Sequence, residues 1–122
     1  MNNPNLKNIR HESVLELGGQ VEIQPGQIVS KTLAQNAAVS VTLFAFDKGE
    51  EISTHQSDGD AMVTVLEGVG QFTVDGKSYV LQKGQTLVMP AGKPHAVFAQ
   101  EPFKMSLLVI FPFPVSEGSQ IH

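Results

Sequence analysis

Regularly spaced turn signals are the feature that most constrains the fold of this chain. They fall at Gly18-Gly19, Pro25-Gly26, Asp47-Lys48-Gly49, Asp58-Gly59, Glu67-Gly68, Asp75-Gly76, Lys83-Gly84, residues 90–94 and Glu101-Pro102. Short apolar or alternating runs lie between them, and no window shows a convincing helical period of apolar residues. This pattern is typical of an all-β sandwich or barrel.

Several of these runs predict individual strands. They mix β-branched, aliphatic and aromatic residues at positions 39–46, 62–66, 86–89 and 105–111. Residues 12–17 fit either one helical turn or the first strand.

A hairpin is the clearest local prediction. Asp75-Gly76 supplies the two positive-φ positions of a type I′ turn. That turn pairs Thr73 with Ser78 and Phe72 with Tyr79.

Composition excludes several classes of protein. The 122 residues are enough for one domain, and 41% of them are hydrophobic. The formal net charge is −4, and no basic patch is visible, so we expect no nucleic-acid partner. The absence of cysteine excludes disulfides, thiol catalysis and Cys-ligated metals. The start of the sequence lacks the features of a signal peptide, and no apolar stretch could span a bilayer. We therefore expect a cytoplasmic protein without a membrane partner.

Histidines are the candidate chemical groups. His11 lies in a polar N-terminal stretch and His122 is the last residue, so both are expected on the surface. His55 and His95 each follow a turn that contains glycine and precede an apolar run. We therefore expect each of them at the beginning of a strand, at the mouth of a barrel, where binding groups commonly lie.

Two segments resemble the two conserved motifs of the cupin superfamily. Gly49 to Ser57, continuing to Gly68, is similar to the first motif, and the segment from Gly84 to His95 is similar to the second. The resemblance extends from about residue 39 to 110. It implies a double-stranded β-helix, which is a short jelly-roll barrel, usually built as a dimer.

The resemblance also implies a ligand set, of which this chain retains half. In metal-binding cupins, two histidines and a glutamate of the first motif join one histidine of the second around an ion. His55 and His95 match the outer two positions. Ser57 replaces the second histidine, and Ala61 stands at the glutamate position. The asparagine that ends the second motif is replaced by Ala99.

A metal site would need a third donor, and Asp60 is the nearest candidate. Strand alternation turns Asp60 away from His55 and His95, whereas a bulge at Asp58-Gly59 would turn it toward them. Ser57 offers only a weak neutral oxygen. We therefore keep two expectations open: one divalent transition metal (Zn, Ni, Fe, Mn or Cu), or none.

The same residues predict a ligand pocket. His55, Ser57 and His95 would be polar anchors, and Met89 and Met105 would line the pocket if they are not simply core. Three functions follow: a protein that binds a small molecule in its barrel, a metal-dependent enzyme of dioxygenase or isomerase type, or a non-catalytic sensing or interaction module. The sequence assigns no catalytic residue.

The expected organisation has three parts. Residues 1–38 form an N-terminal arm with the first strands, residues 39–111 form the barrel core, and residues 112–122 form a tail. Because a short barrel with apolar strands must cover its outer sheet, we expect a homodimer. Residues 14–29 are the plausible strand donor to the other subunit.

Overall fold

A computed structural model describes residues 4–113 of the chain. A short 3-10 helix, η1 (Leu17–Gln20), precedes the strands. Within the described residues, the strands are β1 (Ile28–Gln35), β2 (Val39–Phe46), β3 (Glu51–His55), β4 (Asp60–Glu67), β5 (Val69–Val74), β6 (Lys77–Gln82), β7 (Thr86–Met89), β8 (His95–Phe98) and β9 (Phe103–Ile110).

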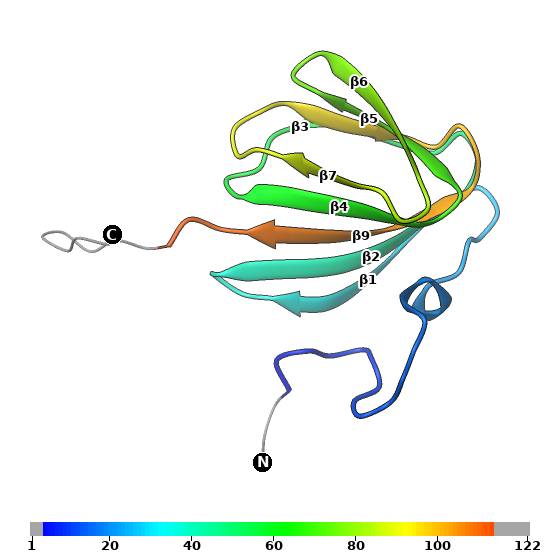
Figure 1. Ribbon diagram of the computed structural model, residues 1–122, viewed down its shortest axis with the longest axis vertical. Helices are drawn as coiled ribbons and strands as arrows, with labels where there is room; N and C mark the ends of the chain where they lie inside the picture. The colour runs from blue at the N-terminus through cyan, green and yellow to red at the C-terminus, as the bar shows by residue number, and fades with distance from the viewer. Residues whose placement is uncertain (1–3, 114–122) are drawn as a thin grey trace, which may run out of the picture.

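The strands form two antiparallel sheets that pack face to face. One sheet has five strands in the order β1-β2-β9-β4-β7, and the other has four in the order β3-β8-β5-β6. The sheets converge where β9 begins and diverge toward the end of β9 (Figure 1). We call these the convergent end and the divergent end. The predicted all-β jelly-roll barrel is confirmed.

The local predictions are largely confirmed. The runs at 39–46 and 86–89 are β2 and β7 with the expected bounds. The hairpin joins β5 to β6, and the φ angles of Asp75 and Gly76 are 51° and 81°. The pairs Thr73–Ser78 and Phe72–Tyr79 have the predicted register.

The N-terminal predictions are wrong in part. The stretch at 12–17 is neither a strand nor a full helical turn, because η1 begins only at Leu17. Residues 14–29 contain no strand before Ile28. The reason is local: Gly18-Gly19 favours a tight turn, and Pro25-Gly26 adds a second turn, in which Gly26 has a φ of 69°. Residues 14–27 therefore form no strand within the single chain, and their donation to a second subunit stays a prediction.

Aromatic side chains fill the convergent end. Phe46, Phe72 and Phe103 are completely buried. The rings of Phe46 and Phe103 stack with centroids 4.7 Å apart, and Phe72 meets Phe103 edge to face at 6.0 Å. Gly70 faces the same ring, and a Cβ atom at Gly70 would lie 2.6 Å from it. This end of the barrel interior is densely packed.

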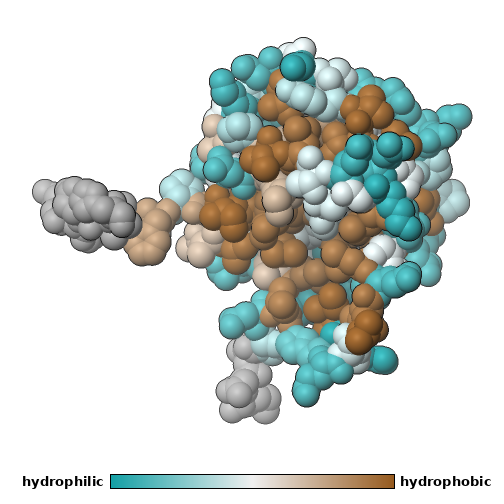
Figure 2. Space-filling view, viewed as in Figure 1, coloured by the Kyte–Doolittle hydropathy of each residue, from teal (hydrophilic) through white to brown (hydrophobic). Residues whose placement is uncertain are grey.

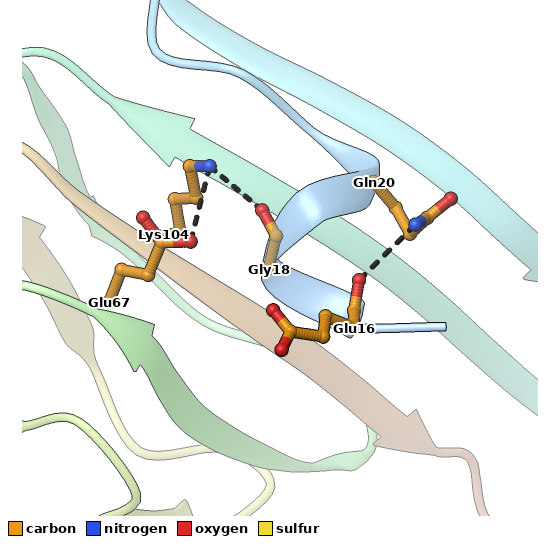
Figure 3. A network of polar contacts seen from close by, with 5 residues as sticks. All are labelled: Glu16, Gly18, Gln20, Glu67 and Lys104. Atoms are coloured by element: carbon orange, nitrogen blue, oxygen red, sulfur yellow. Dashed lines mark hydrogen bonds and ion pairs between the residues drawn. The ribbon is translucent and has the colours of Figure 1, made fainter. Parts of the chain in front are cut away.

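The N-terminal segment packs on the outer face of the five-stranded sheet. A second hydrophobic cluster lies there, made of the buried residues Val21, Leu33, Leu43 and Ala45 with Ile9, Ile23, Val29, Val41 and Leu66 around them. Apolar side chains also reach the surface in the lower part of the molecule, near the N-terminal segment (Figure 2). Lys104 fastens the segment to the barrel (Figure 3). Its Nζ donates to the carbonyl of Gly18 at 2.8 Å and lies 3.4 Å from a carboxylate oxygen of Glu67.

Membrane-spanning helices are not found: across residues 4–113, no helix has the length and apolar character needed to cross a bilayer.

Candidate functional site

His55 and His95 lie side by side at the divergent end. His55 is the last residue of β3 and His95 is the first of β8, and the two are partners in the antiparallel register. The centroids of their rings are 4.2 Å apart, with the planes at 72°. The prediction that each begins a strand holds for His95 and is wrong for His55. Antiparallel pairing explains the result, because the end of one strand meets the start of the next.

Both imidazoles are oriented by the backbone. Nδ1 of His55 lies 2.9 Å from the carbonyl oxygen of Ser53, and Nδ1 of His95 lies 3.1 Å from that of Lys93. Because a carbonyl oxygen can only accept, each Nδ1 carries the proton and donates it. In the neutral ring, the other nitrogen, Nε2, is then left with a free lone pair.

The two rings differ in their exposure to solvent. His55 is exposed, whereas His95 is buried, with only 4% of its surface accessible. Burial lowers the pKa of His95 below its ordinary value of 6.5, and the neighbouring His55 lowers it further. The hydrogen bond to Lys93 acts in the opposite direction and is outweighed. His95 is therefore held as a neutral imidazole at pH 7.

A cavity of about 260 Å³ opens beside the two histidines. Its walls are mostly apolar and come from both sheets, with Ile52, Ala61, Val63, Met89, Val97, Met105, Leu107 and Val109 as the apolar lining. Among residues 4–113, the polar lining is limited to His55, Gln56, Ser57 and His95, and no charged side chain contributes to it. Met89 and Met105 belong both to the buried core and to the cavity wall. The two interpretations of these residues, as core and as pocket lining, are therefore compatible.

Ser57 serves the loop as well as the cavity. Its Oγ accepts a hydrogen bond from the backbone N–H of Gly59 at 3.2 Å. Its carbonyl accepts another from the N–H of Gly92 at 2.9 Å, which ties the loop after β3 to the loop before β8. Ser57 thus helps to hold the two histidine-bearing strands together at the cavity mouth.

Asp60 does not join the histidines. It is exposed, and its Oδ1 accepts a hydrogen bond from the backbone N–H of Ala91 at 2.8 Å. The register shift in β4 lies far from this point, between Val65 and Glu67, so strand alternation is intact at Asp60. The neighbouring Ala61 takes the inward position and lines the cavity.

The donor set can be compared with what a metal requires. Among residues 4–113, no three or more His, Cys, Asp or Glu side chains come together at one point. A tightly held divalent ion has at least three protein donors, whereas His55 and His95 supply two. The residues of this part of the chain therefore do not fit an ion held by the protein alone. His122 lies outside the described residues, and His11 is on the surface, with its Nε2 2.7 Å from the carbonyl of Leu6.

Sequence reasoning missed most of the cavity wall. Val63, Leu107 and Val109 were not singled out, although alternation along β4 and β9 places them on the same face as Ala61 and Met105. Gln56, Ile52 and Val97 carried no comparable signal, because their positions depend on how β3 and β8 pair.

Comparisons with known proteins agree with this architecture. The family described as Cupin domain matches residues 42–111. A conserved protein of unknown function from Streptococcus pyogenes is 46% identical, with a TM-score of 0.89 over 92% of this chain and 98% of its own. A cupin superfamily protein from Desulfitobacterium hafniense is 32% identical, with a TM-score of 0.85 over 89% of this chain and 100% of its own.

More distant matches show the fold alone. Salicylate 1,2-dioxygenase from Pseudoaminobacter salicylatoxidans is 20% identical, with a TM-score of 0.64 over 73% of this chain and 26% of its own. None of the curated proteins compared with the chain matches it. The match over residues 42–111 and the two structures above 30% identity show that the chain belongs to the cupin family.

Proposed function

We propose that this cupin binds a small, largely apolar molecule in the cavity at its divergent end. One observation carries the proposal: two imidazoles, oriented by the carbonyls of Ser53 and Lys93, lie at the mouth of a cavity whose other walls are mostly apolar. Ligand sites commonly combine an apolar lining with a few placed polar groups. In this proposal His55 and His95 orient the ligand, and Met89 and Met105 contact its apolar part.

A fragment screen by thermal shift tests the proposal. A ligand that binds only the folded state raises the melting temperature, and the rise grows with the ratio of its free concentration to its Kd. The blocking variant is Ala61→Leu, whose larger side chain enters the cavity, and the control is His11→Ala on the surface. We expect fragments to stabilise the wild type and His11→Ala but not Ala61→Leu. Equal stabilisation of all three would contradict the proposal.

A metal-dependent enzyme of dioxygenase or isomerase type is the second candidate. It is favoured by the Nδ1 bonds of His55 and His95 to carbonyls, because metal-ligating histidines are commonly oriented in this way. The count of two donors weighs against it.

Metal content separates the two candidates. Untagged protein, purified without chelators, would be compared with the double variant His55→Ala/His95→Ala by inductively coupled plasma mass spectrometry. Near-stoichiometric metal in the wild type and none in the variant would support the enzyme. No metal in either, even after nickel, zinc or iron is added back, would reject it.

Three expectations from the sequence stay predictions. They are the homodimer, the cytoplasmic location, and a non-catalytic sensing or interaction role as the alternative function. Sedimentation at micromolar concentration would test the homodimer.

A further inference from the structure

The hydrogen-bonding capacity of the histidine pair is one-sided. Each Nδ1–H of the histidine pair is already used by a backbone carbonyl, so each neutral ring presents only an acceptor, Nε2, to a ligand. Gln56 and Ser57 add neutral groups that both donate and accept. The histidine pair therefore calls for a ligand group that donates a hydrogen bond.

A negatively charged ligand does not suit this arrangement. In the part of the chain that the structure describes, no lysine or arginine lines the cavity, and Nζ of Lys93 lies instead 3.4 Å from a carboxylate oxygen of Asp75. A carboxylate that enters an apolar cavity without a cation loses its hydration and gains little in return. The two Nε2 lone pairs would also repel its oxygens.

A hydroxyl group suits the arrangement well. Its O–H can donate to an Nε2 atom, while its oxygen accepts from Ser57 or Gln56. The size of the cavity sets a further limit. A dry apolar cavity of about 150 Å³ is known to hold benzene, so about 260 Å³ has room for one ring with small substituents.

We infer that the ligand of this cavity is an uncharged ring that carries a hydroxyl group, a phenol or a small cyclic alcohol, and that a carboxylate of the same shape is rejected. This inference rests on the proposed function, because it names the ligand class of the same cavity. The O–H of the ligand donates to Nε2 of His55 or His95, and the ring packs against Met89, Met105 and Val109.

Three probes with matched rings test the inference: 4-methylphenol, toluene and benzoate. Their binding is followed in full-length protein with 13C-labelled methionine methyl groups at pH 8, above the ordinary pKa of an imidazole, about 6.5. The methyl groups of Met89 and Met105 line the cavity and report entry, whereas Met62 is exposed and serves as the internal reference.

The expected result is an order of affinities. We expect 4-methylphenol to bind about tenfold more tightly than toluene, which lacks the hydrogen bond, and benzoate to leave both cavity methyl groups unshifted at millimolar concentration. In His55→Leu/His95→Leu the preference for 4-methylphenol over toluene should vanish. If the double variant does not fold, His55→Leu alone replaces an exposed ring and should reduce the preference.

The outcomes separate a failure of the inferred ligand class from a failure of the proposed binding function. Benzoate or toluene binding as tightly as 4-methylphenol would overturn the inference and leave the proposed binding function standing. Retention of the full preference in the folded double variant would overturn it as well. If no probe shifts the methyl groups of Met89 or Met105, the cavity does not admit a ring and the inference fails, whereas the proposed function fails only if the thermal-shift screen also finds no fragment that Ala61→Leu blocks.

Discussion

The two ends of the barrel interior are built from the same strands for opposite purposes. At the convergent end, β9 contributes Phe103, which is completely buried between Phe46 and Phe72. At the divergent end, the same face of β9 contributes Val109 to a cavity of about 260 Å³. The inward face of β9 therefore packs in the core at the start of the strand and lines the pocket near its end. The difference teaches that the pocket lies where the sheets diverge and where smaller side chains, such as Ala61 and Val109, face inward.

The contrast has an energetic side. Atoms that line an empty space lack contacts that a filled core would supply. Ala61 leaves such space at the divergent end, while the phenylalanines supply dense contacts at the convergent end. We therefore expect stability to depend mainly on the convergent end and ligand binding on the divergent end.

Truncation at the convergent end should have the largest effect. Phe103→Ala removes a completely buried ring that contacts two others, and we expect the free energy of unfolding to fall by about 3–5 kcal/mol. Urea denaturation at equilibrium measures it. The matched control is Phe113→Ala, because that ring is 70% exposed and should change stability by less than about 0.5 kcal/mol. Similar losses in both variants would show that stability does not depend mainly on the convergent end.

Overpacking at the same end should have the next largest effect. A Cβ atom at Gly70 would lie 2.6 Å from the ring of Phe103, so Gly70→Ala should cost about 1–3 kcal/mol. Gly19→Ala is the control, since nothing lies within 4 Å of its Cβ position. Calorimetry of the two variants checks this, and a Gly70→Ala protein as stable as wild type would mean that the ring moves aside freely.

Filling the divergent end should be tolerated. Ala61→Leu adds more volume than Gly70→Ala, yet we expect it to change the free energy of unfolding by less than about 1 kcal/mol, because the added carbons enter existing space. Urea denaturation gives the value. A loss as large as that of Gly70→Ala would remove the distinction between the two ends.

The pH dependence of stability should show the smallest effect. Because the pKa of His95 is lower in the folded state than its ordinary 6.5, the unfolded chain binds the proton first as the pH falls. The free energy of unfolding should therefore decrease from about pH 6.5 downward. His95→Gln should show a smaller decrease between pH 7 and pH 5 than the wild type or the surface variant His11→Gln. Thermal unfolding at each pH measures the decrease. The same decrease in His95→Gln as in the wild type would contradict the lowered pKa of His95.

Prediction from the sequence succeeded where local chemistry decides the structure. The Asp75-Gly76 turn determines its own hairpin, and strand alternation correctly turned Asp60 outward and left Ala61 facing inward. Local signals could not show that the end of β3 meets the start of β8, because this pairing joins residues forty positions apart, His55 and His95. The sequence also could not predict the hydrogen bonds from Nδ1 of the two histidines to the carbonyls of Ser53 and Lys93, because these bonds depend on side-chain rotation.

The position of β9 in the chain has a consequence for how the protein is made. β9 pairs with both β2 and β4 at the centre of its sheet, although it follows the other described strands in the sequence. During synthesis, β2 and β4 therefore wait with unpaired edges until residues 103–110 leave the ribosome. Pairing over such sequence distances is slow. The barrel should thus assemble only after β9 has emerged, and a nascent chain stalled before Phe103 should be prone to aggregation.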